Sequence, residues 1–396
     1  MNKVIRLIGI IMCLVFGENS EGTIPLENST LPAETKLSKL VENHKDKLSK
    51  SKVYIAVSVY DQVPFIPNLR KTLEANVTEL ARYGVKSHVI ITCDGRDEDF
   101  NECNKQFKGF PEKLQILFKE KDNEKILDIA DALMKNDIIE KPEKYASLTA
   151  KQEKLLHHLG AAISVSLVRY HQLKDIHELM KKDEEENLSP YFFMFDGDDI
   201  IHKDLLLIEL LALLETGADT ASPGNYFGMY DKSLKENVSS GNILRCKVED
   251  SQEILKRASR EVDSILMLND QGYFEEFAFN LFDRRVLEKT LSKNYVFGYV
   301  GEERPINPNT DFVTLDPFKD AITKLVKVFL LNVPGQEKYQ KAGKGSDPFS
   351  VPFFDKRNEQ NTLFYYMQHN DSMQGQIREM KWKEASDEEI LTSPKE

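Results

Sequence analysis

The sequence predicts an α/β fold in which helices flank a mostly parallel β-sheet. Residues 53–59 and 88–92 are rich in β-branched and other apolar residues, a composition typical of buried strands. A helical stretch, residues 67–83, separates them. The order strand, helix, strand is typical of a parallel sheet, because the helix returns the chain to the edge where the first strand began. A further apolar run, residues 191–195, predicts another buried strand.

The other predicted elements are helices. Residues 104–150 are charged and mixed, and we expect two helices there. Residues 155–173 follow a long helical pattern, and the charged residues 181–187 interrupt the chain after it. Residues 205–215 predict a buried amphipathic helix that ends at Gly217, because glycine readily adopts the left-handed conformation of a helix C-terminus.

The composition is that of a globular protein. The chain has 396 residues, of which 41% are hydrophobic and 30% are charged. Its 53 Lys and Arg against 65 Asp and Glu give a net charge of −12, which disfavours nucleic acid as a partner. A nucleotide remains compatible with this charge, because one local cation can neutralise a diphosphate.

The N-terminus resembles a targeting segment. Lys3 and Arg6 precede an apolar run over residues 7–16, which is too short to span a bilayer comfortably. We therefore expect a signal peptide over residues 1–17, followed by a polar linker over 18–50; the alternative is a buried N-terminal helix or strand. No other stretch is apolar enough to predict a membrane span. The protein is then secreted or exported, to a periplasm or to the lumen of a eukaryotic secretory pathway.

The cysteines outside this leader are Cys93, Cys103 and Cys246. Their odd number and irregular spacing match neither a disulfide framework nor a zinc site. A single bridge between Cys93 and Cys103 stays open.

The most informative segment is Asp196-Gly-Asp-Asp199, which follows a buried strand directly. Several carboxylates at the end of a core strand repel one another unless a positive charge lies among them. In open α/β sheets ligands bind at this end of the strands, so a hard divalent cation fits the pattern. The alternative is an acidic turn with a helix cap. A calcium loop of the EF-hand type is excluded, since Ile201 and Leu207 occupy its glycine and glutamate positions.

Residues 193–205 resemble the D-x-D signature of nucleotide-sugar glycosyltransferases with the GT-A fold, of the large family-2 type. Other segments resemble the same family in the family's order, scattered between about residues 53 and 375. These segments are residues 55–73, 91–97, 160–162, 215–219 and 282–287. Only the D-x-D segment is specific by itself. The resemblance implies a GT-A domain over residues 51–335 and a closing segment over 336–396.

The resemblance also implies roles for single residues. Asp196 would contact the ribose or nucleotide side of the donor, and Asp198 would bind a manganese or magnesium ion that Asp196 shares. Asp94 would reach the nucleotide base, with Ser58 and Tyr60 lining the same pocket. A plain turn residue before Gly95 is the alternative for Asp94.

The catalytic base is less well defined, because the Glu-Asp pair usual in the family is missing. Asp311 is the first candidate, Glu302 and Glu303 are rivals, and Asp316 is weaker; each also fits a solvated loop acid. His369 matches a histidine that returns to the metal or diphosphate in the family. A surface or packing histidine is the alternative.

The implied activity is the inverting, non-processive transfer of a sugar, most commonly from a UDP-sugar, to a hydroxyl of a glycan, lipid or protein. The Q-x-x-R-W pattern of processive synthases is absent, and Trp382 is the only tryptophan. Cys93 and Arg96 replace an acid and a serine of the nucleotide turn, which leaves the donor's base open. The alternatives are a nucleotidyltransferase and a non-catalytic sugar- or nucleotide-binding protein of the same fold.

Overall fold

A computed structural model of the chain describes most of the N-terminal half and shorter segments of the rest. The described residues are 33–121, 123, 164, 167–169, 171–183, 186–223, 227–230, 245–247, 251–270, 281–287, 328–332 and 363–368. The predicted signal peptide, residues 1–17, lies outside them. No helix among the described residues is long and apolar enough to cross a membrane.

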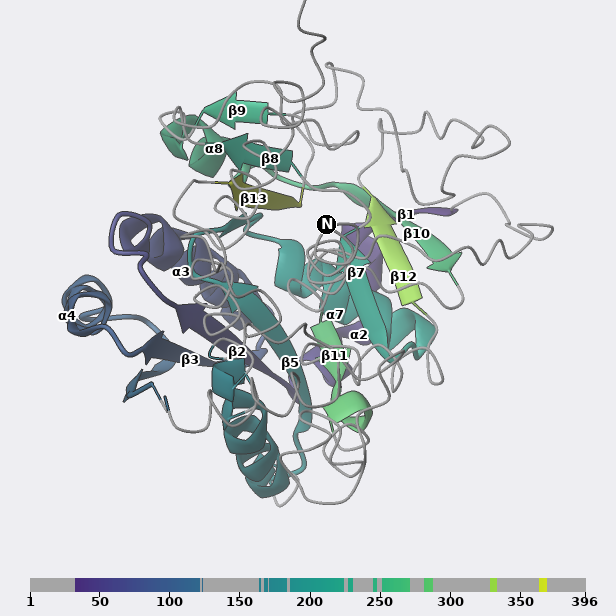
Figure 1. Cartoon of the computed structure of the whole chain (residues 1–396). Coiled ribbons are helices and arrows are strands. Elements are labelled where there is room, and N and C mark those ends of the chain that lie inside the picture. The colour runs from purple at the N-terminus through teal and green to yellow at the C-terminus, as the bar shows by residue number, and fades with distance from the viewer. Residues whose placement is uncertain are drawn as a thin grey trace, which may run out of the picture.

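In the part of the chain that the structure describes, the centre is a nine-stranded sheet with the order β1-β10-β12-β7-β11-β5-β2-β3-β4 (Figure 1). Its strands are β1 (Ala33–Lys36), β2 (Ser51–Val59), β3 (Lys86–Asp94), β4 (Lys113–Lys119), β5 (Ser189–Asp196), β7 (Thr220–Pro223), β10 (Ser264–Asp270), β11 (Leu281–Asp283) and β12 (Val328–Asn332). The pairs β5–β2, β2–β3, β3–β4 and β12–β7 are parallel, and only β10 and β11 run against the other strands of this sheet. The predicted α/β fold with a mostly parallel sheet is confirmed.

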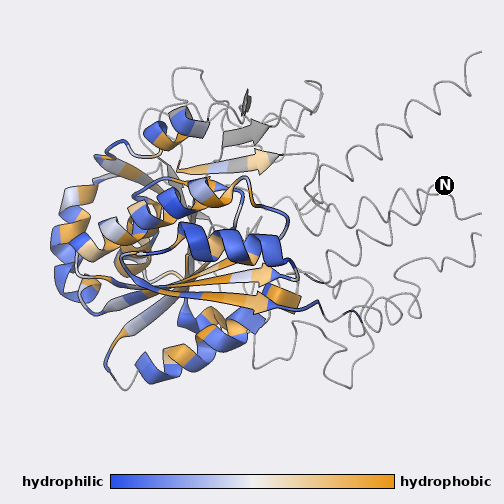
Figure 2. Ribbon diagram, turned by 90° about the vertical axis from the view of Figure 1, so that its left-hand side faces the viewer, coloured by the Kyte–Doolittle hydropathy of each residue, from blue (hydrophilic) through white to orange (hydrophobic). Residues whose placement is uncertain are grey.

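Helices cover both faces of this sheet. Side chains alternate along β2, so that Val53, Ile55 and Val57 lie in one core cluster while Tyr54 and Ala56 lie in another. Four helices contribute side chains to the first cluster; they are α2 (Leu37–Leu48), α3 (Ile66–Arg82), α4 (Asp97–Gln106) and α7 (Leu205–Thr216). The second receives the helical residues 171–183. Because both faces are covered, the central strands are apolar along nearly their whole length, as Figure 2 shows.

Helix α3 shows why these segments fold as they do. Its buried apolar residues recur every three or four positions, which places them on one face of the helix. They are Ile66, Leu69, Leu73, Val77 and Leu80. Pro67 stands in the first turn, where its missing N–H costs no helical hydrogen bond. The helix therefore begins at Ile66, after the loop of residues 60–65 that follows β2.

A second, four-stranded sheet has the order β6-β13-β8-β9 and lies above the large sheet in Figure 1. Its strands are β6 (Ile200–Ile201), β8 (Phe227–Tyr230), β9 (Arg245–Lys247) and β13 (Phe364–Gln368). Helix α8 (Ser251–Arg257) packs on it through a small cluster that includes Ile200, Ile254 and Tyr365. Since β6 follows β5 after only three residues, this sheet begins directly beside the acidic turn.

Several sequence predictions are confirmed at the level of single elements. The strands at 53–59, 88–92 and 191–195 are β2, β3 and β5, and the helix at 67–83 is α3. Helix α7 ends at Gly217, whose φ of 65° is left-handed.

Other predictions need correction. The region 104–150 was expected to hold two helices, but residues 113–119 form the edge strand β4 and α4 ends at Gln106. Helix α7 is buried on every side from Leu205 to Leu213, Glu209 included, so it is not amphipathic. Within the expected polar linker 18–50, residues 33–48 form β1 and α2. These two elements belong to the fold, because β1 pairs with β10 and α2 buries Leu40 and Leu48. Cys93 and Cys103 are both free and buried.

Candidate functional site

Three parallel strands end side by side at one edge of the large sheet, and each end carries predicted site residues. Ser58 on β2 stands opposite Asp196 on β5, and Val59 stands opposite Cys93, the residue before Asp94 on β3. Because parallel strands all finish at the same edge, Ser58, Tyr60, Asp94 and Asp196 come together although up to 138 residues separate them in sequence, from position 58 to position 196.

The acidic turn is held against β2 by its glycine. The Gly197 N–H donates to the Ser58 carbonyl oxygen at 3.1 Å. A Cβ atom at Gly197 would lie 2.4 Å from Gln62 Oε1 and 2.9 Å from Val59 Cγ2. The close approach of the loop after β2 therefore requires glycine between the two aspartates of the D-x-D segment.

The three aspartates of the turn have different surroundings. Asp196 Oδ1 accepts a hydrogen bond from Arg169 Nη2 at 2.5 Å, and the Asp196 side chain is 32% exposed. Asp199 is buried and accepts the backbone N–H of Met367 on β13 at 2.7 Å, so it ties the turn to the second sheet. Asp198 lies between them and is partly exposed.

Gln172, in the helix of residues 171–183, is hydrogen-bonded to the ends of both β2 and β3. Gln172 Nε2 donates to the Val57 carbonyl at 2.9 Å and to Thr92 Oγ1 at 3.0 Å. Gln172 Oε1 accepts a hydrogen bond from Ser58 Oγ at 3.3 Å. The hydroxyl of Ser58 therefore faces the helix of residues 171–183. If Ser58 lines a ligand pocket, its hydroxyl also keeps this hydrogen bond to Gln172.

Asp94 is buried at the end of β3 and accepts a hydrogen bond from Ser164 Oγ at 2.6 Å. Burial raises the pKa of the Asp94 carboxyl, while the Ser164 hydrogen bond and the nearby Lys121 and Lys119 charges oppose that shift. Gly95 follows with a φ of 70°, and a Cβ there would lie 2.8 Å from Lys121 Cγ. The Asp94–Gly95 pair thus makes a tight turn that lies close against Lys121, which follows β4 at the same edge.

The loop between β2 and α3 is clamped from α4. Asp99, fully buried in the first turn of α4, accepts the backbone N–H of Asp61 at 2.7 Å and that of Gln62 at 2.9 Å. Asp61 has a φ of 56°, an uncommon conformation for a residue with a side chain, and its carboxylate pairs with Arg96. Asp99 therefore sets the position of the loop that faces Gly197.

The ring of Tyr60 lies at the same edge, beneath the ammonium group of Lys121. The Lys121 ammonium lies 4.0 Å from the centre of the Tyr60 ring, which is cation–π geometry. The edge therefore combines carboxylates with basic side chains, namely Lys121 beside Asp94 and Arg169 beside Asp196. Such a surface can bind a ligand with both hydroxyl donors and phosphate oxygens.

The carboxylates at the turn can coordinate a divalent cation only together with oxygen atoms from a bound ligand. No group of three His, Cys, Asp or Glu suited to a metal occurs in the part of the chain that the structure describes. Asp196 and Asp198 supply two carboxylates. Magnesium-like ions are commonly held by one or two carboxylates together with substrate phosphates and water. These residues therefore fit a cation that arrives with a diphosphate, and they do not form a closed metal cage.

Sequence reasoning missed several residues that shape this edge, and it named others that the structure does not describe. The residues that were not singled out are Arg169, Gln172, Asp99 and Lys121. Arg169 and Gln172 lie three positions apart on the predicted helix 155–173. The remaining site candidates lie outside the described residues; they are Asp311, Glu302, Glu303, Asp316 and His369.

The chain matches no protein-family model and no curated protein. Among solved structures it is similar to S. aureus TarS. The fragment 1–349 aligns with a TM-score of 0.37 and 11% identity, over 87% of this chain and 67% of that chain. The complex of that fragment with UDP-GlcNAc gives a TM-score of 0.38 and 10% identity, over 87% and 68%. The longer TarS structure gives 0.34 and 11%, and the match covers 40% of it. A likeness of this size assigns no role to any single residue of this chain.

Proposed function

We propose that this protein is a glycosyltransferase that transfers a sugar from a nucleotide-diphosphate sugar to an acceptor hydroxyl. The observation that supports it most directly is the Asp196–Asp199 turn. It stands at the ligand-binding edge of a parallel sheet, two strands away from a second buried carboxyl, Asp94. The sequence around the turn resembles the D-x-D segment of the family-2 glycosyltransferases, in which UDP is the commonest donor nucleotide.

The spacing of the strands suits a donor that lies across the end of β2. Two strand spacings, about 10 Å, separate β3 from β5. A nucleotide would then place its base beside Asp94 and Tyr60 and its diphosphate beside Asp196 and Asp198. Asp94 would accept a hydrogen bond from the base, which its Ser164 contact leaves room for, since a carboxylate has two oxygens.

The negative charge of the turn and of the diphosphate would be balanced by Arg169 and by a divalent ion. Arg169 fixes the carboxylate of Asp196 and brings a positive charge to the side where the diphosphate would lie. Manganese or magnesium would be held by Asp196 and Asp198, and when bound it neutralises charge on the leaving diphosphate. Asp199 would act through position alone, because its carboxylate holds β13 against the turn.

The acceptor half of the reaction rests on residues outside the described part of the chain. Inversion at the sugar carbon requires a base that takes the proton of the acceptor hydroxyl. Asp311 is the first candidate for that base and Glu302 its rival, and His369 would reach the metal or the diphosphate. A glycan, a lipid and a protein all remain candidate acceptors.

A donor screen tests the proposal. Release of nucleoside diphosphate from a panel of nucleotide sugars is measured with and without manganese. The same screen is run for Asp198→Asn and for Asp46→Asn, an exposed acid on α2. We expect manganese-dependent turnover that Asp198→Asn abolishes and Asp46→Asn leaves unchanged, with both variants folded.

Other outcomes would distinguish the alternatives. Turnover that does not depend on metal would remove the cation from the proposal. Saturable UDP binding without turnover of any donor would favour a non-catalytic binding protein. Release of pyrophosphate from a nucleoside triphosphate and a sugar phosphate would identify a nucleotidyltransferase.

A further inference from the structure

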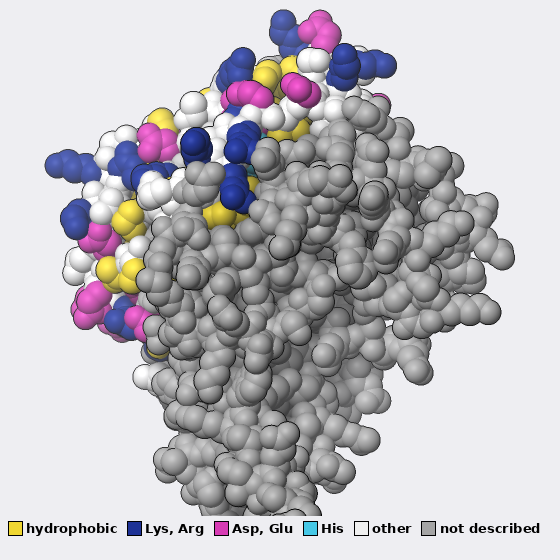
Figure 3. Space-filling view, turned by 90° about the horizontal axis from the view of Figure 1, so that it is seen from above, with side chains coloured by type: hydrophobic (Ala, Val, Ile, Leu, Met, Phe, Trp, Pro, Cys, Tyr) yellow, Lys and Arg dark blue, Asp and Glu magenta, His cyan; other side chains and the backbone are white. Residues whose placement is uncertain are grey.

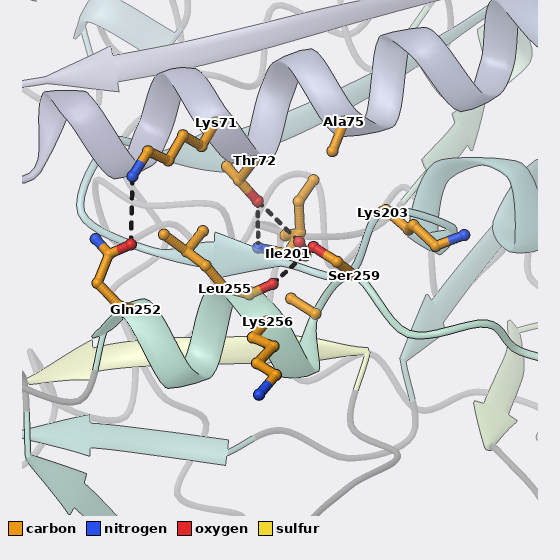
Figure 4. Close-up of a pocket in the computed structure, with 10 residues that line it drawn as sticks. Lys71, Thr72, Ala75, Ile201, Lys203, Gln252, Leu255, Lys256 and Ser259 are labelled. Atoms are coloured by element: carbon orange, nitrogen blue, oxygen red, sulfur yellow. Dashed lines mark hydrogen bonds between the residues drawn. The ribbon is translucent and has the colours of Figure 1, made fainter.

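The described surface away from the donor edge presents no concentrated charge. Seen from above, basic and acidic side chains are interspersed (Figure 3). A cavity between α3 and α8 has lysines among its lining residues, but Lys71 donates to Gln252 and Lys256 points away from the space (Figure 4). Neither feature offers a ligand a set of charged partners. The groups with chemistry that the donor site does not use lie in the core instead.

Two thiols meet in the core directly behind the donor edge. Cys93 stands on β3 immediately before Asp94, and Cys103 lies in the last turn of α4. Both side chains are fully buried in the same core cluster, and a hydrogen bond joins the two thiol groups. Both are free cysteines in this structure. The two sulfur atoms are therefore already neighbours across the contact between strand and helix.

The periodicities of the two elements explain why these side chains meet. Val89, Ile91 and Cys93 alternate along β3 onto the face of the sheet that α4 covers. On α4 the buried residues are Asp99 and Cys103, which lie four positions apart and so share one side of the helix. Asp99 uses this position to hold the β2–α3 loop, and Cys103 uses it to contact β3.

Helix α4 is held against the sheet by few buried side chains of its own. Of its ten residues only Asp99 and Cys103 are buried, and one of these is a carboxylate. Phe100 packs against the core but is only partly buried. A covalent bond at Cys103 would therefore secure the helix that carries Asp99, and with it the loop that faces the acidic turn.

We propose that Cys93 and Cys103 form a disulfide when the chain folds under oxidising conditions, and that this bridge fixes α4 to the end of β3. The predicted leader would carry the chain into a compartment with such conditions. The inference does not depend on the proposed glycosyltransferase activity, because the bridge acts on the packing of α4 and neither thiol is needed to bind a donor.

The oxidation requires an electron acceptor, and a small disulfide such as oxidised glutathione supplies it. The thiolate of one cysteine attacks the oxidant, which forms a mixed disulfide and releases one molecule of glutathione. The thiolate of the other cysteine then attacks the protein sulfur of the mixed disulfide and releases the second molecule. The two cysteines lose two electrons and two protons in total, and the two glutathione thiols receive them.

Burial determines when this exchange can take place. The attacking species is a thiolate, and the hydrogen bond with Cys93 and burial both raise the pKa of the Cys103 thiol. Neither side chain is exposed to an oxidant in the folded protein. The bridge therefore forms before α4 has packed on β3, and the folded dithiol form resists oxidation.

Refolding of the full chain tests this inference. Reduced protein is unfolded in urea and refolded in a mixture of reduced and oxidised glutathione, while a second sample is kept folded in the same mixture. Free thiols are then alkylated under denaturing conditions. Trypsin cleaves after Lys86, Arg96 and Lys105, so the two cysteines fall on separate peptides, residues 87–96 and 97–105. Mass spectrometry should find these peptides joined in the refolded sample and alkylated in the sample that stayed folded.

Thermal melting shows whether the bridge fixes the helix. We expect the oxidised wild type to melt about 5 °C above the reduced form. Cys246→Ser, which removes a cysteine elsewhere in the chain, should keep this difference, and Cys103→Ser should abolish it. Folded protein with both thiols alkylated after refolding would overturn the inference, as would a bridge from either cysteine to Cys13 or Cys246. A bridged form that melts no higher than the reduced form would refute the effect on α4.

Discussion

Glu209 makes the stability of this protein depend on pH in a direction that can be tested. It lies in the middle of α7 with no exposed surface, and among the described residues neither carboxyl oxygen makes a hydrogen bond of ordinary geometry. Burial raises the pKa of this carboxyl well above its ordinary value, and the backbone of Leu281 opposes the shift to a smaller extent. The folded protein therefore holds Glu209 in its neutral form at a pH where the unfolded chain has lost that proton.

The sign and size of the effect follow from the protons bound in each state. Above the ordinary pKa of 4.5, the folded state binds one proton more than the unfolded state at this position. The free energy of unfolding then falls as pH rises, by about 1.4 kcal/mol per pH unit, until the pH passes the raised pKa. Each pH unit of this fall is a sizeable part of a typical total of about 5–15 kcal/mol.

Substitution of Glu209 isolates this contribution from those of other buried groups. Burial lowers the pKa of His202 to about 3, which makes stability rise with pH below the ordinary histidine range and partly masks the trend. We therefore expect the difference between Glu209→Gln and wild type, measured by urea denaturation at several pH values, to grow with pH. Glu209→Leu should be more stable than Glu209→Gln at every pH, because it also removes a buried polar group. Parallel curves for wild type and Glu209→Gln would refute the reasoning.

Three further predictions concern contacts elsewhere in the fold. Asp99→Asn should lower the free energy of unfolding by about 1–3 kcal/mol, since the β2–α3 loop loses charge-assisted hydrogen bonds; urea denaturation measures this, and Asp97→Asn should not share the loss. Gly197→Ala should reduce nucleotide binding, measured by calorimetry, because its Cβ would lie 2.4 Å from Gln62 Oε1, and binding equal to wild type would show that the loop relaxes. Asp183→Asn should lower the free energy of unfolding by about 3 kcal/mol, because it leaves the largely buried Lys52 without its charge partner at 2.6 Å. Thermal melting should detect this loss, and nucleotide affinity should not change.

The central strands were predictable because both of their faces are buried. Segments such as residues 53–59 must then be apolar at nearly every position, which is a strong local signal. The edge strand β4 was missed for the opposite reason. Its residues alternate between partly buried and exposed, and lysines stand at both ends, so the segment looks like its charged neighbours. The core face of α2 was overlooked among lysines, although Leu37, Leu40 and Leu48 carry a helical spacing.

The site was predictable only where its residues follow the strands. Asp94 and the Asp196–Asp199 turn stand at strand ends, so sequence order alone places them at one edge. The partners that position them come from other elements. Arg169 reaches Asp196 across 27 residues of chain, and Asp99 reaches Asp61 across 38. Contacts of this kind depend on how helices pack on the sheet, and no local pattern specifies them.

The three aspartates of the turn can lie together because each has a different electrostatic environment. Asp196 is neutralised by Arg169, and Asp199 is buried under β13 with a backbone N–H as donor. Mutual repulsion is therefore reduced before any ligand binds, and the turn does not require a cation in order to fold. The same pairing weakens the turn as a metal site, since a carboxylate that already holds an arginine attracts a cation less strongly. A cation would then need the oxygens of a diphosphate to complete its coordination, so ion and donor should bind this edge together, each increasing the affinity of the other.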